Sequence, residues 1–388
     1  MTEAELFLAL AKLLLIKSMA TNAPSSEHVP SLPEASTESG NKERWLIIDN
    51  DAGIDDAAAM VLAGSLAKSY GVVIKALVVS YGNVGREHVL RNNAKIRQHM
   101  GPDGISIPIL PGHDKPLVAT AGHASFWHGL DGLGDAKGIP QGPFPLPHDG
   151  PVEGGSQDMI ARVTEIAEEA ASKGHELIYC VLGPMTNLAS AVRVNPKLKS
   201  LIKRLVVMGG CGNARGNDSL TGEFNVLTDP EAASIVFATF DNVEVVSWEL
   251  TLVHSVPWPI FDKWRSLAPQ HPAIDFLDKV LHLAYVERRV VHTDSYKYNG
   301  AIICDALAIA YVLEPKLAKK SKSVWVGVEL EGTLTRGQTV VDWGTSQQAG
   351  KHGDKNCTWV IDIDQTVWEE MFARIGVGES SSSKPSSE

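Results

Sequence analysis

The chain has 388 residues, of which 44% are hydrophobic, so it can bury a large core and should fold as a globular protein. Its formal net charge of −11 at pH 7, with no long Lys/Arg cluster, argues against a nucleic-acid partner. The cysteines are widely separated and form no C-x-x-C pair, which argues against a structural zinc site or a disulfide framework; they are Cys180, Cys211, Cys304 and Cys357.

The N-terminal segment carries conflicting signals about localisation. Residues 6–16 (LFLALAKLLLI) have the length of a signal-peptide hydrophobic region, but Glu3 and Glu5 replace the usual positive start and Lys12 interrupts the run. These differences favour a cytoplasmic protein, while secretion stays open. No other segment approaches the roughly 20 apolar residues that a membrane-spanning helix needs, so no membrane partner is expected.

Composition divides the chain into three parts. Residues 1–42 are a weak signal segment or a disordered leader, rich in Ser, Pro, Glu and Asn towards its end, and residues 378–388 have the composition of a disordered tail. The folded unit is therefore predicted to span residues 43–377 as a single domain.

Within this unit, short hydrophobic runs alternate with segments of helical period. The runs lie at residues 45–49, 72–80, 176–183, 204–210 and 243–248, and the helical segments at 56–67, 87–99, 156–173 and 229–239. This alternation predicts buried strands joined by crossover helices. The predicted fold class is α/β, with an open, mostly parallel sheet flanked by helices. In such sheets, ligands bind at the carboxyl ends of the strands.

An acidic cluster follows the first predicted strand. Asp49, Asp51, Asp55 and Asp56 lie within eight residues of the segment IIDNDAGIDDAAAM. Four carboxylates at one strand-to-helix turn would repel one another unless a cation neutralised them. Calcium accepts six to eight oxygen ligands in irregular geometry, and magnesium, which is stricter, remains an option. Interaction with the following helix dipole would explain only Asp55 and Asp56.

The segment DNDAGIDDA resembles the D-x-D-P-G-x-D-D signature of the inosine-uridine preferring nucleoside hydrolase family. Further similar segments follow in the family's order: YGNV (81–84), WHGLDGLG (127–134), LGPMTNLA (182–189), VVMGG (206–210), GNDSLTGEFNVLTDPEAA (216–233) and CDALAIAYVLEP (304–315). The resemblance covers nearly the whole folded unit. It implies that family's fold, a ribonucleoside substrate cut into free base and ribose, calcium as the cofactor, and a homodimer or homotetramer.

The resemblance also implies a role for each matching residue. The metal ligands would be Asp51, Asp56, Asp305 and the main-chain carbonyl of Leu182, where the family usually has Thr. Asp51 would also be the general base that activates a calcium-bound water against an oxocarbenium-like sugar. The residues implied at the ribose are Asp55, Asn83, Met208, Asn217, Glu223 and Asn225. Such contacts to vicinal hydroxyls predict discrimination against deoxyribose.

The leaving-group side departs from the family's usual pattern. Cys304 stands where the inosine-uridine enzymes often have His, and a subgroup of the family resembles this chain in carrying Cys. A thiol with a pKa near 8.5 is a poor acid at neutral pH, so Cys304 could equally be a small buried hydrophobe. The other candidates on this side are Trp127, His128, His254, Tyr296 and Tyr298. No acid is assigned, and the preference for purine or pyrimidine stays open.

Two other functions are compatible with parts of the sequence. DIDQT (362–366) fits the D-x-D-x-T pattern of aspartyl-nucleophile phosphatases, but it lies too near the end of the sequence for the acids and lysine that such enzymes need downstream, and a final strand with a capped helix is the simpler interpretation. A non-catalytic member that binds metal and nucleoside is the second alternative, because fold does not guarantee function.

Overall fold

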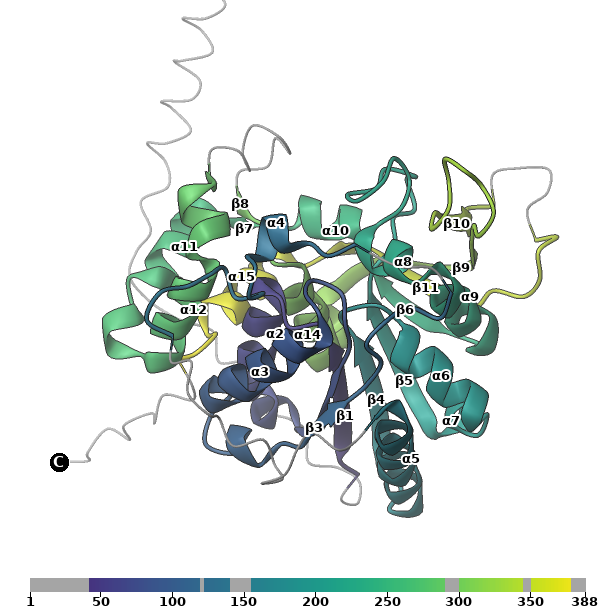
Figure 1. Cartoon of the computed structure of the whole chain (residues 1–388), viewed down its shortest axis with the longest axis horizontal. Coiled ribbons are helices and arrows are strands. Elements are labelled where there is room, and N and C mark those ends of the chain that lie inside the picture. The colour runs from purple at the N-terminus through teal and green to yellow at the C-terminus, as the bar shows by residue number, and fades with distance from the viewer. Residues whose placement is uncertain (1–41, 119–121, 140–154, 290–299, 345–349, 378–388) are drawn as a thin grey trace, which may run out of the picture. The chain divides into compact units, whose positions relative to one another are not determined.

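A mixed sheet forms the centre of the computed structural model, which describes residues 42–118, 122–139, 155–289, 300–344 and 350–377. Nine strands of these segments pair in the order β10-β9-β11-β6-β5-β4-β1-β2-β3 (Figure 1). Their bounds are β1 Arg44–Asn50, β2 Val72–Val79, β3 Ile109–Pro111, β4 Glu176–Val181, β5 Ile202–Met208, β6 Val243–Val246, β9 Ala318–Val328, β10 Thr339–Asp342 and β11 Cys357–Ile363. Neighbouring strands from β11 to β3 pair in parallel, and β9 pairs antiparallel with both β10 and β11.

Helices cover both faces of the sheet, as the predicted α/β class requires (Figure 1). Along β1, Leu46 and Ile48 pack with α2, α3, α12, α14 and α15, whereas Trp45 and Ile47 pack with α5, α6 and α9. Alternate residues of the strand are therefore buried on opposite faces, which explains why the strands read as continuous hydrophobic runs. The helix bounds are α2 Ile54–Leu66, α3 Arg86–Ile96, α4 Ser125–His128, α5 Ser156–Ser172, α6 Thr186–Val194, α7 Leu198–Leu201, α8 Phe224–Thr228, α9 Pro230–Thr239, α10 Trp248–Val253, α11 Trp258–Arg265, α12 Pro272–His282, α14 Cys304–Leu313 and α15 Gln365–Ala373.

The predicted strands and helices are confirmed with shifts of a few residues at their ends. The sequence did not indicate β9, whose first half (AKKSKS) is polar and mostly exposed beside β11. The described residues belong to one compact unit, and no helix among them is long and hydrophobic enough to cross a membrane. The predicted leader, except Lys42, and the predicted tail lie outside the described residues.

The order in which strands are added to the sheet reverses at β1: β2 and β3 lie on one side of it, and β4 begins the other side. Strand β1 pairs with β2 on one side and with β4 on the other, so the loops that follow β1 and β4 diverge to opposite faces. This is the topological switch point, where open parallel sheets bind ligands.

Candidate active site

The predicted site residues meet at the carboxyl ends of four neighbouring strands. Asp51 follows β1, Asn83 follows β2, Leu182 follows β4, and Met208 ends β5. Asp305 reaches the same place from the first turn of α14, far along the sequence. The switch point thus gathers residues that no local sequence pattern connects.

Four carboxylates converge there. Asp55, Asp56 and Asp305 have oxygens that all lie within 4.8 Å of one another. Asp51 adjoins this trio, because its backbone N–H donates to Asp56 Oδ1 at 3.3 Å. Asp55, which the resemblance placed at the ribose, therefore lies as close to Asp56 and Asp305 as these two implied metal ligands lie to each other.

Asp49, the first aspartate of the sequence cluster, has a different position. Its carboxylate is buried in the sheet, where it accepts hydrogen bonds from Tyr179 Oη and Asn187 Nδ2, both at 2.9 Å. Burial raises its pKa to about 7, against the effect of these two bonds. Asp49 joins β1 to β4 and α6, so the expectation that one cation neutralises all four clustered aspartates is wrong for this residue.

The converging carboxylates have no permanently charged partner within the described segments, and the nearest basic group to Asp55 is His128, whose Nδ1 lies 3.8 Å from Asp55 Oδ1. Burial is the main cause that raises the pKa of Asp51 and Asp305 well above the ordinary value and that of Asp55 to about 7; the charge of a neighbouring aspartate adds to each shift. Among the described residues no Lys or Arg forms an ion pair with them, and the buried Asp55 Oδ1 has no hydrogen-bond partner. Buried charges need a partner. The oxygen-only donor set fits a hard divalent cation.

Asp51 is held in a tight cradle. The backbone N–H of Asn83 donates to its Oδ2 at 2.9 Å, and the Asn83 side-chain amide donates to its Oδ1 at 3.0 Å. A Cβ on Gly183 would lie 2.9 Å from Asp51 Cγ, and one on Gly82 would lie 1.9 Å from Oδ2. A side chain at either position would therefore displace the Asp51 carboxylate. The Asn83 amide also donates to Asp56 Oδ2 at 3.2 Å, so it orients carboxylates in addition to lining the cavity.

Residues expected at the ribose lie on the other side of the cluster. Glu223 caps α8, where its carboxylate accepts backbone N–H bonds from Asn225, Val226 and Gly210. Asn225 Nδ2 donates to the Leu182 carbonyl at 2.8 Å. A carbonyl oxygen has two lone pairs, so this bond leaves the second for a metal ion. Asn225 Nδ2 also lies 3.4 Å from Met208 Sδ, and the exposed Asn217 accepts a bond from the Phe224 N–H.

An open cavity of about 770 Å³, part of it open to solvent, lies above the carboxylates. Asp55 and Asp305 line it, whereas Asp51 and Asp56 are fully buried behind them. Its other walls include the aromatic side chains Phe126, Trp127, Phe224, Trp248 and Tyr285. Of these, only Trp127 was a candidate from the sequence, because the others come from separate elements with no shared spacing. Aromatic walls above a charged floor suit a ligand with a flat apolar part and a polar part.

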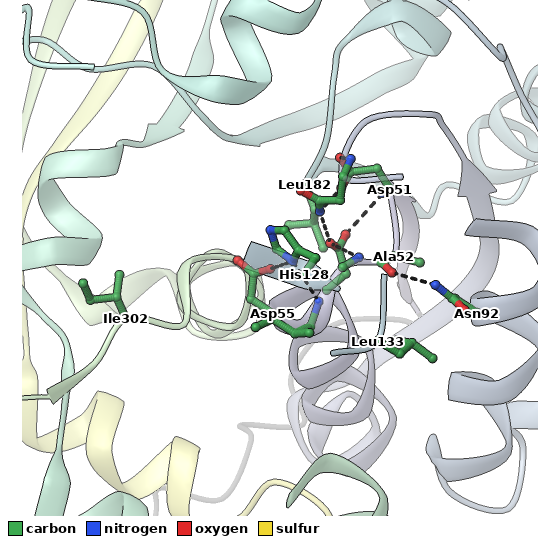
Figure 2. A network of polar contacts seen from close by, with 12 residues as sticks. Asp51, Ala52, Asp55, Asn92, His128, Leu133, Leu182 and Ile302 are labelled. Atoms are coloured by element: carbon green, nitrogen blue, oxygen red, sulfur yellow. Dashed lines mark hydrogen bonds and ion pairs between the residues drawn. The ribbon is translucent and has the colours of Figure 1, made fainter. Parts of the chain in front are cut away.

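Three candidates for the leaving-group side line this cavity: Trp127, His128 and Cys304. His128 Nδ1 accepts the Ile54 N–H at 3.1 Å, and burial lowers the pKa of His128 to about 3 (Figure 2). The ring is therefore neutral, with its proton on Nε2. Cys304 Sγ lies 3.3 Å from Thr251 Oγ1, and burial raises its pKa well above the ordinary value, so the thiol stays protonated.

The remaining candidates lie elsewhere. His254 is outside the cavity lining and bonds Gln365 Oε1 at 2.9 Å, with Asp362 at 3.1 Å. Tyr296 and Tyr298 lie outside the described residues. In the DIDQT segment, Asp364 caps α15 by accepting the N–H groups of Thr366 and Val367, as the capped-helix interpretation predicted.

Comparisons with known proteins agree on one family. The family model described as inosine-uridine preferring nucleoside hydrolase matches residues 46–370. The pyrimidine-specific ribonucleoside hydrolase RihA of Escherichia coli O1:K1 is 32% identical over 330 residues, which cover 84% of this chain and 96% of that protein. RihA of Klebsiella pneumoniae is 32% identical over 333 residues, covering 85% and 97%.

Solved structures of similar proteins match across the same region. An inosine-guanosine nucleoside hydrolase superposes with a TM-score of 0.74 at 28% identity, covering 87% of this chain and all of the other. A purine-preferring ribonucleoside hydrolase from Gardnerella vaginalis gives a TM-score of 0.70 at 26% identity, covering 86% and 98%. The names of the similar proteins thus include both pyrimidine and purine specificities.

Proposed function

The chain belongs to the inosine-uridine preferring nucleoside hydrolase family, and we propose that it hydrolyses the N-glycosidic bond of ribonucleosides to free base and ribose, with calcium as its cofactor. One observation carries the cofactor assignment. Four carboxylates converge at the floor of the cavity, and no Lys or Arg of the described segments pairs with them.

Asp51, Asp56, Asp305 and the Leu182 carbonyl would hold the cation, with Asp55 beside them. Bound calcium would lower the pKa of a water molecule, orient it, and offset the repulsion among the carboxylates. All these donors are oxygens, which favours calcium or magnesium over zinc, and the irregular arrangement favours calcium.

Asp51 is the residue that we assign as general base. Its two hydrogen bonds from Asn83 and the close approach of Gly82 and Gly183 fix the direction of its carboxylate. A base held in one orientation can accept the proton of the attacking water without first reorganising.

The negative groups around the cavity suit the charge that develops during cleavage. Breaking a ribose–base bond gives the sugar oxocarbenium character, which nearby carboxylates and carbonyl oxygens stabilise. Asp55 Oδ1 is buried and accepts no hydrogen bond from the described residues, with His128 Nδ1 at 3.8 Å, so it can accept a ribose hydroxyl. A substrate without the 2′-hydroxyl would leave such groups unpaired, and we therefore propose strong preference for ribonucleosides.

The aromatic walls provide surfaces for the base. Trp127, Phe224, Trp248 and Tyr285 line the cavity above the carboxylates. The neutral His128 could donate a hydrogen bond from Nε2, whereas the Cys304 thiol is proposed to pack rather than to protonate the leaving base. The similar proteins differ in base specificity, so no base is assigned. A dimer or tetramer and a cytoplasmic location stay predictions.

The test is release of free base from a panel of ribonucleosides and their 2′-deoxy counterparts, in buffer without phosphate. We expect release from at least one ribonucleoside, little from its deoxy counterpart, and loss of activity when a chelator removes calcium. Tight calcium binding without release from any nucleoside would instead support the non-catalytic alternative. Release that requires phosphate would contradict hydrolysis.

A further inference from the structure

Helix α3 presents two consecutive asparagines to the turn between β1 and α2. Asn93 Nδ2 donates to Asn50 Oδ1 at 2.7 Å, and Asn50 Nδ2 donates back to Asn93 Oδ1 at 3.1 Å. Asn92 Nδ2 donates to the Ala52 carbonyl at 3.2 Å. The helix therefore binds the residues on both sides of Asp51, although it contributes no ligand of its own.

Ala52 is the strained residue of this turn. Its φ of 38° lies in the left-handed region, which residues with a Cβ adopt only at a cost. The next residue, Gly53, donates its N–H to Asp56 Oδ2 at 2.8 Å, and the preceding residue is Asp51. The conformation of Ala52 therefore sets the position of Asp51 relative to Asp56.

Asn92 also reaches the loop that follows His128. The same Nδ2 donates to the Asp131 carbonyl at 2.8 Å (Figure 2 shows Asn92 beside Ala52). The loop packs so closely that a Cβ on Gly132 would lie 2.8 Å from Asn92 Nδ2 and 3.3 Å from the Ala52 carbonyl oxygen. One buried amide thus joins the aspartate turn to the loop of a cavity-lining histidine.

We propose that Asn92 is a positioning residue for the cation site: by binding the Ala52 and Asp131 carbonyls, it stabilises the left-handed turn that places Asp51 and Asp56. Asn92 does not line the cavity, so it acts through these residues rather than on the substrate. The inference rests on the proposed function, because it assumes that the carboxylates bind calcium.

The test compares Asn92→Ala with Asn356→Ala in the full-length protein. Asn356 is a matched control, since its Nδ2 also bridges two main-chain carbonyls, those of Phe237 at 2.8 Å and Val326 at 2.9 Å, beside β9 and β6. Both variants should lower the Tm. Calcium dissociation constants from isothermal titration calorimetry should rise about 10- to 100-fold for Asn92→Ala, the range typical of residues that orient metal ligands. The Asn356→Ala value should stay close to that of the wild type.

Ala52→Gly separates positioning from general stability. Glycine adopts positive φ readily, so this change should recover much of the calcium affinity in the Asn92→Ala background while altering the wild type little. If Asn92→Ala does not fold, Asn92→Asp keeps the side-chain shape, and its carboxylate has no N–H for the two carbonyls. It should therefore weaken calcium binding as well.

The possible results distinguish the inference from the proposed function. If the wild-type protein binds no calcium, the proposed cofactor is wrong, and the inference falls with it. If the wild type binds calcium but the Asn92 variants bind it as tightly as Asn356→Ala, the inference alone is overturned. The inference alone is also overturned if adding Ala52→Gly to Asn92→Ala restores no calcium affinity.

Discussion

Gly183→Ala tests whether the placement of Asp51 limits turnover. The added Cβ would lie 2.9 Å from Asp51 Cγ and 3.1 Å from Oδ1, and Gly183 has no positive φ that would make alanine unfavourable. An ordinary contact between these atoms is about 3.5 Å, so the carboxylate must move by about half an ångström. A displacement of 1 Å costs about 100-fold in rate, so half of it should cost about tenfold in kcat, or about 1.4 kcal/mol.

The assay is kcat on the best ribonucleoside at saturating calcium, together with the Tm. Gly155→Ala is the control, because its Cβ would meet no atom within 4 Å and its backbone is extended at the start of α5. It should lower stability by less than about 1 kcal/mol and leave kcat unchanged. A wild-type kcat for Gly183→Ala would refute the argument that the glycine cradle fixes a catalytic carboxylate.

Three further predictions concern the charged floor and the thiol. Asp51→Asn keeps the shape but removes the base, so kcat should fall by at least about 100-fold at saturating calcium; near wild-type turnover would disprove the assignment. Cys304→Ser should lower activity only a few-fold, because serine can keep the contact to Thr251; a loss of several orders of magnitude would place the thiol in the chemistry. Burial raises the pKa of Asp55 from 3.8 to about 7, so the contribution of Asp55 to the stability of the calcium-free protein is fully present below pH 3.8 and is lost as the pH rises through 7. The Tm gained on adding calcium should therefore be larger at about pH 8 than at about pH 5, and an equal gain would contradict this.

The sequence predicted the strands and helices well because both faces of the sheet are covered. Residues 45–48 and 177–182 are uninterrupted hydrophobic runs, which are typical of strands buried on two sides. Strand β9 was missed because its polar first half, which pairs with β11 but not with β10, lacks this pattern.

The site could be predicted only in part, because the roles of its residues depend on contacts between separate elements. Spacing along the chain could not distinguish Asp49 from Asp51, because the difference lies in partners from other elements: Tyr179 and Asn187 bind Asp49, and Asn83 binds Asp51. No local sequence pattern marks Asp305 as a metal ligand, and only the family resemblance implied that role. The aromatic wall was mostly missed because its members belong to segments that only the fold brings together.

The central claim is that the aspartate cluster binds a divalent cation that hydrolysis requires. The direct test is to remove metal with a chelator and to measure base release as calcium is added back, for the wild type and for Asp305→Asn. We predict that calcium restores wild-type activity in a saturable manner, and that Asp305→Asn, which loses one converging carboxylate, needs far more calcium or stays inactive. Wild-type hydrolysis that continues unchanged in chelator, or identical calcium dependence in both proteins, would contradict the claim.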